Sequence, residues 1–313
     1  MHKVGYVLSD GFQVMSLATQ AVFEYANRAA GEPFYEIRVF SATGGEVRSS
    51  LGMAVSTRAL GRADAADTWI VAGVNDPLAV PAAPPVLKFL RRAARVARRT
   101  AAICTGGFVL AEAGLLDGRR ATTHWAFARA LRERHPGIRV EDDRIFIVDG
   151  PVWTSAGMSA GLDLALAMVE QDLGTHVARS VARKLVMPQR RSGGQSQHSE
   201  MLDLAPKSDR IQAALDYARK HLGQPLSVEE LAEAVHLSPR QFSRVFTAET
   251  GRSPARAVEA LRLEAARLMI EQSRHPLETI AHETGFRDRR HMREVFMRGY
   301  GTPPLALRRA ARQ

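Results

Sequence analysis

The chain has 313 residues, which is long enough for two domains that each bury a core of their own. Its formal charge of +10 favours a polyanionic partner such as nucleic acid, and its single cysteine excludes an internal disulfide. The first residues lack the features of a signal peptide, and no apolar run approaches the length of a membrane span. We therefore expect a cytoplasmic, nucleoid-associated protein without a membrane partner.

Strand-like and helical segments alternate between residue 1 and about residue 185. The short apolar or β-branched segments are residues 4–8, 35–41, 68–72, 100–104 and 144–148. The helical segments between them are residues 17–30, 85–99, 108–113 and 125–135. This alternation predicts an α/β domain with a mostly parallel sheet and helices on both faces. In such sheets, ligands bind at the carboxyl ends of the strands.

One of these strand ends holds Cys104, followed by Thr105, Gly106 and a predicted helix. Glycine permits a sharp turn here, and a helix N-terminus stabilises an anion such as a thiolate. Twenty residues later, His124 follows a second strand. Taken singly, a buried cysteine and a buried histidine are more often structural than functional.

Four motifs taken together favour a functional interpretation. They are Ile103-Cys104-Thr105-Gly106, Ala111-Glu112-Ala113-Gly114-Leu115-Leu116-Asp117-Gly118, Thr122-Thr123-His124-Trp125 and Trp153-Thr154-Ser155-Ala156-Gly157-Met158-Ser159-Ala160-Gly161-Leu162-Asp163. This set resembles the PfpI-like branch of the class I glutamine amidotransferase superfamily, whose members include intracellular proteases, deglycases and isonitrile hydratases. The resemblance implies a flavodoxin-like/PfpI-like sandwich with Cys104 at the position of the nucleophile and His124 as its neighbour.

The sequence departs from the enzymes of that branch on its first helix. There Ser16 occupies the position where the resemblance predicts an acidic residue, and Asp10 is a weak substitute. A nucleophile needs a base, and the base needs an orienting partner. We therefore predict no catalytic residue, no cofactor and no metal, but a degenerate pocket that binds a small molecule. The predicted pocket residues are Cys104, His124, Ser16, Asp10, Thr105 and Gly106.

Residues 186–208 are polar and rich in Gly and Ser, which is typical of a linker. We favour a flexible spacer over phosphate contacts by Arg190 and Arg191. Ser208 or Asp209 can cap the first helix of the region that follows.

Residues 226–304 contain the same helical pattern twice. A short helix, a turn and a second helix end at Gly251 and Pro254, and the pattern repeats up to Gly301 and Pro304. Two helices joined by a tight turn form the helix-turn-helix motif. Residues 254–272 read as one long helix that holds the two motifs at a fixed spacing.

The second helix of each motif carries cationic and polar residues on the face that its apolar positions leave outside. Arg can contact guanine bidentately, Gln can pair with adenine, and further cations can hold phosphates. The predicted DNA-binding residues are Arg240, Gln241, Ser243, Arg244, Arg289, Arg290 and Arg293. Glu294 is left outside this set, because it either accepts from a cytosine or pairs with a neighbouring arginine. The alternative is a helical bundle with a solvated arginine face, and the second copy argues against it.

The repeated motifs are similar to the AraC/XylS family of transcription regulators. The similarity rests on Arg262-Leu263-Glu264-x-Ala266-Arg267, Ile280-Ala281, Gly285-Phe286-x-Asp288, Phe296 and Gly301-x-Pro303-Pro304. With the linker string Arg190-Arg191-x-Gly193-Gly194-Gln195-x-Gln197, the whole chain resembles GlxA-type regulators. The resemblance implies a PfpI-like sensing and dimerising domain over residues 1–185, the linker over 186–208, and an all-α AraC-type domain over 209–313.

By this resemblance the partners are double-stranded promoter or operator DNA, a small effector such as a nitrogen-containing metabolite, and a second copy of the chain. Two alternatives stay open. One is a cysteine-dependent hydrolase or hydratase with an accessory DNA-binding tail. The other is a redox sensor in which Cys104 oxidises, although a lone thiol has no resolving partner within the chain.

Overall fold

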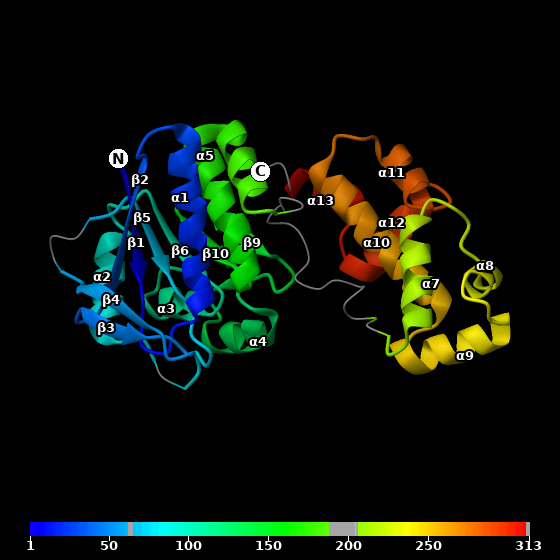
Figure 1. Ribbon diagram of the computed structural model, residues 1–313, viewed down its shortest axis with the longest axis horizontal. Coiled ribbons are helices and arrows are strands. Elements are labelled where there is room, and N and C mark those ends of the chain that lie inside the picture. The colour runs from blue at the N-terminus through cyan, green and yellow to red at the C-terminus, as the bar shows by residue number, and fades with distance from the viewer. Residues whose placement is uncertain (62–64, 80, 188–203, 205, 311–313) are drawn as a thin grey trace. The chain divides into compact units, whose positions relative to one another are not determined.

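The computed structural model describes residues 1–61, 65–79, 81–187, 204 and 206–310, and the chain divides into two compact units, Met1–Gln197 and His198–Gln313 (Figure 1). Most of the predicted linker, including Arg190 and Arg191, lies outside the described residues. None of the described helices combines the length and the hydropathy that a membrane crossing requires.

One mostly parallel sheet organises the first unit. Its strands are β1 (His2–Val7), β2 (Tyr35–Ser41), β3 (Gly45–Arg48), β4 (Ala54–Ala59), β5 (Thr68–Val71), β6 (Arg99–Ile103), β9 (Phe146–Asp149) and β10 (Val152–Ser155). They lie in the order β3-β4-β2-β1-β5-β6-β10-β9, parallel from β4 to β10 and antiparallel at the two outermost pairs. The short strands β7 (Arg120–Ala121) and β8 (Arg139–Val140) pair separately. The predicted mostly parallel α/β sheet is confirmed.

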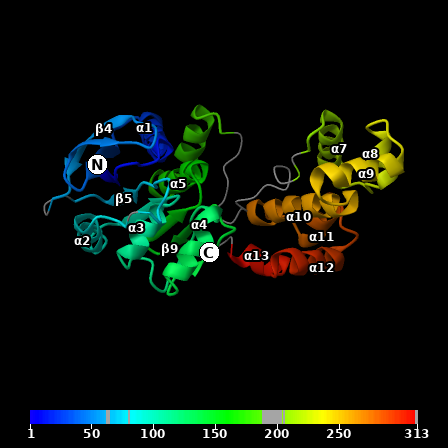
Figure 2. The same cartoon turned by 90° about the horizontal axis from the view of Figure 1, so that it is seen from below.

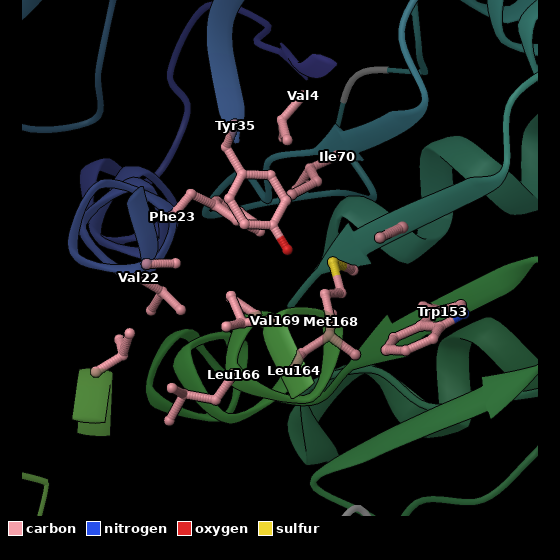
Figure 3. Close-up of a cluster of buried hydrophobic side chains, with 14 of the residues drawn as sticks. Val4, Val22, Phe23, Tyr35, Ile70, Trp153, Leu164, Leu166, Met168 and Val169 are labelled. Atoms are coloured by element: carbon pink, nitrogen blue, oxygen red, sulfur yellow. The ribbon is translucent and has the colours of Figure 1, made fainter. Parts of the chain in front are cut away.

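The helices α1 (Thr19–Ala30) and α5 (Met158–Lys184) cover one face of this sheet (Figure 1). The core beneath them gathers side chains from both helices and from the central strands. Figure 3 shows the ring of Tyr35 among Phe23 of α1 and Leu164 and Met168 of α5, all of them buried. Burying this apolar surface is the main force that holds the layer on the sheet.

A second core lies on the other face, under α2 (Pro84–Ala93), α3 (Gly106–Glu112) and α4 (Trp125–Arg134). Trp69 of β5 packs edge-on against Phe89 of α2, with ring centroids 4.7 Å apart. Phe108 of α3 and Leu131 of α4 belong to the same core. Two helical layers around one sheet therefore give the sandwich that the resemblance implied.

The second unit consists of helices on either side of one long helix (Figure 2). They are α7 (Asp209–Lys220), α8 (Val228–Glu233), α9 (Pro239–Thr250), α10 (Pro254–Gln272), α11 (Leu277–Glu283), α12 (Arg289–Tyr300) and α13 (Pro304–Ala310). The side chains of α7 to α9 share one core with the first half of α10, and those of α11 to α13 share another with its second half. The two predicted helix-turn-helix motifs and the helix that joins them are confirmed.

Some boundaries differ from the sequence prediction for physical reasons. The helix expected over residues 85–99 ends at Ala93, and β6 begins at Arg99. Arg98 and Arg99 both pair with the buried Asp172; Arg99 is buried with it as the first residue of β6, and Arg98 stays half-exposed. A 3-10 helix, η1 (Val14–Ala18), precedes α1 where one continuous helix was expected.

Candidate effector site and nucleic-acid interface

Cys104 forms a sharp elbow between β6 and α3. Its φ of 55° lies in the left-handed region, which is costly for a residue with a side chain. Gly106 follows the elbow, and a Cβ at that position would lie 2.5 Å from the carbonyl oxygen of Val71. The sequence therefore needs a glycine there so that α3 can start directly against β5.

The Cys104 thiol is buried, with 2 % of the residue exposed. Burial raises the pKa of the Cys104 thiol to about 11, although hydrogen bonds from the backbone and side chain of Thr105 act in the opposite direction. At neutral pH the sulfur is consequently a protonated thiol. A cysteine nucleophile reacts as the thiolate, so this environment disfavours covalent chemistry.

Ser16 is fully buried on η1. The backbone N–H of Gly73 donates to Ser16 Oγ over 3.4 Å. The next N–H, that of Val74, donates to Thr105 Oγ1 over 2.8 Å, so the backbone of Gly73 and Val74 lies between Ser16 and the elbow. A serine hydroxyl at this place offers no carboxylate to accept a proton from Cys104.

His124 serves as the N-cap of α4, where its Nδ1 accepts from the backbone N–H of Ala126 over 3.3 Å. Beside it, the Thr123 hydroxyl donates to the carbonyl oxygen of Cys104 over 3.1 Å. The structure thus brings the strand end before His124 against the elbow. Within the described residues, no group of three His, Cys, Asp or Glu side chains is placed to hold a metal ion.

A cavity with a volume of about 520 Å³ lies beside the elbow. This volume is in the range of small-molecule sites. The lining comes from the ends of β1 and β5, from the segment before α2 and from one face of α3. It comprises Ser9, Asp10, Gly11, Ser50, Ala72, Val74, Asn75, Asp76, Pro77, Pro81, Ala82, Ala83, Thr105, Phe108, Val109 and Glu112.

The charged lining of this cavity is acidic. Asp10 Oδ1 accepts from the N–H of Arg48 over 3.1 Å, and Glu112 Oε2 accepts from the N–H of Ala82 over 2.8 Å. Asp76 Oδ1 accepts from two successive N–H groups at 2.9 and 3.1 Å. Backbone N–H groups thus hold one oxygen of each carboxylate, and the other oxygen has no hydrogen-bond partner in the described part of the chain. No Lys, Arg or His lies among the described lining residues.

Of the six residues predicted for the pocket, Asp10 and Thr105 line this cavity. Cys104, Ser16 and Gly106 are buried behind it, and His124 caps α4. Sequence reasoning missed Asp76 and Glu112. Asp76 comes soon after a buried strand, where ligand-binding groups collect, and that position was a usable signal.

In the first helix-turn-helix motif, the recognition helix is α9. Arg240 and Arg244 are exposed on it, whereas Ser243 is half-buried. Gln241 is exposed but engaged in a capping box: its Oε1 accepts from the N–H of Ser238 at 3.3 Å and from the Ser238 hydroxyl at 2.9 Å. Gln241 therefore offers mainly its amide N–H₂ outward, which is less than a bidentate adenine contact requires.

In the second motif, α12 exposes Arg289, Arg290 and Arg293. Arg290 Nε donates to Glu294 Oε1 over 3.1 Å, which is the arginine pairing considered for Glu294. Asp288 caps the helix, and the bond from the N–H of His291 holds the pKa of the Asp288 carboxyl below its usual value. The cap fixes the helix start from which these arginines project.

Arg262 of the joining helix α10 holds the segment between α7 and α8. Its Nε donates to the carbonyl oxygen of Leu222 over 3.1 Å, and its Nη2 donates to that of Gln224 over 2.6 Å. Burial lowers the pKa of the Arg262 guanidinium. The turn of the second motif reaches the same place, because a Cβ on Gly285 would lie 1.9 Å from the Leu222 oxygen and 2.7 Å from Arg262 Nε. This close approach gives a physical basis for the fixed spacing expected from the long helix.

Two family models match the chain, one for each unit. Residues 3–171 match the DJ-1/PfpI family, and residues 231–310 match a helix-turn-helix domain. The structure of an AraC family transcriptional regulator from Pseudomonas putida superposes with a TM-score of 0.53 at 25 % identity, covering 59 % of this chain and 100 % of that one. These features define a DNA-binding protein with an α/β domain of the PfpI type.

Similarity to curated proteins extends over nearly the full length. The chain is 31 % identical to the HTH-type transcriptional regulator GlxA of Rhizobium meliloti, covering 99 % of this chain and 96 % of the relative. It is 33 % identical to the regulator CdhR of Pseudomonas aeruginosa, over 90 % and 84 %. An isonitrile hydratase of Pseudomonas putida is 40 % identical over only 32 % of this chain and 42 % of the enzyme. The chain belongs to the DJ-1/PfpI family, among the HTH-type transcriptional regulators related to GlxA.

Proposed function

We propose that this protein is a sequence-specific transcription regulator whose N-terminal unit binds a small effector and whose C-terminal unit binds operator DNA. The observation that carries the proposal is the repeated helix-turn-helix motif with exposed arginines on α9 and α12. The near-full-length similarity to named regulators supports it over an enzyme with an accessory tail.

In vitro selection of genomic DNA fragments tests the DNA-binding half of this proposal. The full-length protein should recover a shared motif, whereas residues 1–185 alone should recover none. A full-length variant with Arg240→Gln and Arg293→Gln is the matched control, because it keeps the size and the fold of the tail. Recovery of the same motif by residues 1–185 alone would overturn the assignment of DNA binding to the tail.

The acidic lining of the 520 Å³ cavity indicates the chemical class of the effector. Asp10, Asp76 and Glu112 each keep one oxygen without a partner in the described chain, and Phe108 and Val109 supply apolar wall. Three carboxylates in one cavity, with no cation among its described lining residues, attract a cationic ligand. The effector is therefore a small molecule with a cationic nitrogen and a short apolar body, which agrees with the nitrogen-containing metabolite expected from the resemblance.

Thermal-shift measurements with small amines, guanidines and quaternary ammonium compounds, each beside a neutral isostere, test this site. Stabilisation by cationic members only, lost in Asp76→Asn and Glu112→Gln, is the expected result. Glu46→Gln is the matched control, because Glu46 is an exposed carboxylate on β3 outside the cavity. Equal stabilisation by the neutral isosteres would exclude a cationic effector.

The hydrolase alternative rests on Cys104 and on the partial similarity to an isonitrile hydratase. Against it are Ser16 in the place of an acid and the protonated, buried thiol. Cys104→Ala separates the possibilities. A regulator keeps DNA binding and shows at most altered effector affinity, a hydrolase loses turnover, and a redox sensor loses its response to peroxide.

The assembly that we propose is a homodimer formed through the N-terminal unit. Two tails on one dimer would engage two DNA segments at once, which raises affinity through effective concentration. Analytical ultracentrifugation of the full chain and of residues 1–185 tests this, and a monomer in both cases would contradict it.

A further inference from the structure

A second cavity of the N-terminal unit lies at the amino ends of the strands, opposite to the effector cavity. Thr100 at the start of β6 and Val152 at the start of β10 form part of its wall, and its volume is about 370 Å³. The two cavities share no lining residue. This second cavity therefore constitutes a separate candidate site.

Its charge is the reverse of that of the effector cavity. Arg91 and Arg95 of α2 and Arg119 before β7 line it, and Asp117 is the one carboxylate among the described lining residues. Asp149, which pairs with Arg119 from outside the lining, is a second carboxylate, so three cations against two carboxylates leave one positive charge in surplus. Such a surplus attracts anions more strongly than the same charges on an open surface do.

Two of the three guanidiniums are held in place by protein acceptors. Arg91 Nε donates to the carbonyl oxygen of Ala113 at 3.2 Å, and its Nη2 donates to that of Glu112 at 3.3 Å. Arg119 Nη1 donates to the carbonyl oxygen of Asp149 at 3.3 Å and forms an ion pair with Asp149 Oδ1 at 3.5 Å. These bonds use part of the five donors of each guanidinium and orient the rest.

Arg95 is different, because its guanidinium forms no hydrogen bond or ion pair with the described residues. It is exposed at the cavity wall on the turn that follows α2. Asp117 shares the cavity but no ion pair joins it to Arg95 within the described chain. All of the guanidinium donors of Arg95 are thus available to a ligand.

We propose that this cavity binds a small oxyanion, namely the phosphate or carboxylate group of a metabolite. The guanidinium fork matches both groups, since each presents two oxygens to parallel N–H donors. Arg95 is the main anion contact, because carbonyl oxygens hold Arg91 and Asp149 partly offsets the charge of Arg119; the remaining donors of Arg119 supply a second contact. Asp117 disfavours a second negative group and accepts a hydrogen bond from a hydroxyl or ammonium group on the same ligand.

Isothermal titration of the full-length protein with inorganic phosphate and with succinate, at constant ionic strength adjusted with chloride, tests the proposal. Saturable one-site binding of either anion is expected, and the tighter anion identifies the oxyanion group. Arg95→Gln and Arg119→Gln should each weaken it about tenfold, the loss of one charge-assisted contact. Arg95→Gln is decisive, because no contact within the described fold depends on that side chain.

Lys88→Gln is the matched control, since Lys88 is exposed on α2, lies outside the cavity and carries the same charge. It should leave the affinity unchanged. Equal weakening in Lys88→Gln would show general electrostatic attraction and overturn the site. Phosphate binding that persists unchanged in both arginine variants would place the anion on the basic tail and overturn it as well.

Discussion

Cys104 combines two properties that conflict in an enzyme. The elbow places it at a strand end in a strained backbone conformation, the geometry expected of a nucleophile. Its side chain, however, belongs to the apolar core between the sheet and the α1/α5 layer. The elbow sets the start of α3, whose residues Phe108 and Val109 line the cavity together with Thr105, while burial raises the pKa of the thiol.

Burial of this thiol predicts a pH dependence of stability. An unfolded cysteine has a pKa of about 8.5, whereas the pKa of Cys104 is raised to about 11 in the folded protein. Below the unfolded pKa the thiol is protonated in both states. As the pH rises through the interval between the two pKa values, only the unfolded state ionises, so stability falls. From pH 8 to 10.5, wild type should lose about 2 kcal/mol more than Cys104→Ala.

Urea unfolding of both proteins at pH 8, 9.5 and 10.5 measures this difference. The comparison isolates Cys104, because Tyr6 and Tyr35, whose pKa values burial also raises, are present in both proteins. If both proteins lost the same stability between pH 8 and 10.5, burial would not raise the pKa of the Cys104 thiol. That result would support the enzymatic alternative.

The arginines of the recognition helices give a second prediction. Arg290 and Glu294 are both largely exposed, with 86 % and 54 % of their side chains accessible. An exposed pair of this kind contributes only about 0.3–0.5 kcal/mol, so it orients Arg290 without preventing a base contact. Arg240→Gln and Arg290→Gln should each cost about 1–3 kcal/mol at one base position and relax preference there.

Competition binding with operator variants measures this loss. Arg219→Gln on α7 is the control, since it removes one exposed positive charge outside both recognition helices. If Arg240→Gln and Arg290→Gln both retain the wild-type base preference, the orientation proposed for the recognition helices is wrong.

At the scale of elements, three glycines with similar positive φ allow two costs of a Gly→Ala substitution to be compared: backbone strain alone, and strain together with a steric clash. Gly251, Gly285 and Gly301 have φ of 70°, 75° and 63°. No atom lies within 4 Å of a Cβ built on Gly251 or Gly301, whereas on Gly285 the Cβ would meet the Leu222 oxygen and Arg262. Gly251→Ala should cost about 1–2 kcal/mol, the usual left-handed penalty. Gly285→Ala should cost about 1–3 kcal/mol more through overpacking.

Chemical denaturation of the full-length variants measures both values, with Gly301→Ala as a second open-space control. The Gly285 variant should also bind operator more weakly, because Leu222, Arg262 and Gly285 hold the turn of the second motif against α10 and the segment before α8. Equal costs at Gly251 and Gly285 would mean that the contact between the motifs yields easily and does not fix their spacing.

The elements that the sequence predicts well are those whose burial is periodic. β2 has the predicted bounds because its apolar residues lie between polar neighbours, and α10 has them because Pro254 marks its start. The antiparallel hairpin β3–β4 was not predicted, because its residues are mostly exposed and carry no apolar period. The strand pairing of such a hairpin is decided by the neighbouring β2, which a local pattern does not reveal.

The cavity shows the same limit for the candidate site. Asp10, Asp76 and Glu112 come from three separate segments, and only the order of β1, β5 and β6 in the sheet brings them together. The sequence motifs pointed to the elbow itself, where Cys104 and Ser16 are buried. The acidic charge of the lining, on which the proposed cationic effector depends, is a property of the assembled fold.

At the scale of the whole molecule, the proposed mechanism is a population shift. An effector in the acidic cavity favours one arrangement of the dimer and so changes the spacing at which the tails meet DNA. A ligand shifts that equilibrium only as far as its affinities for the two arrangements differ. Effector binding without a change in operator affinity would therefore refute coupling while leaving both sites intact.

The positive charge of the molecule gives the last prediction. Each phosphate contact by a cation changes the slope of log K against log salt by about −0.9. Arg289 and Arg293 have no ion pair with the described residues, so they are free to contact phosphates. Arg289→Gln and Arg293→Gln should each reduce the slope by about one and weaken binding to all sequences alike. Fluorescence anisotropy titrations between about 50 and 200 mM salt measure this slope. An unchanged slope with altered base preference would assign these two arginines to base contacts, and the phosphate contacts would then belong to other cations of the tail.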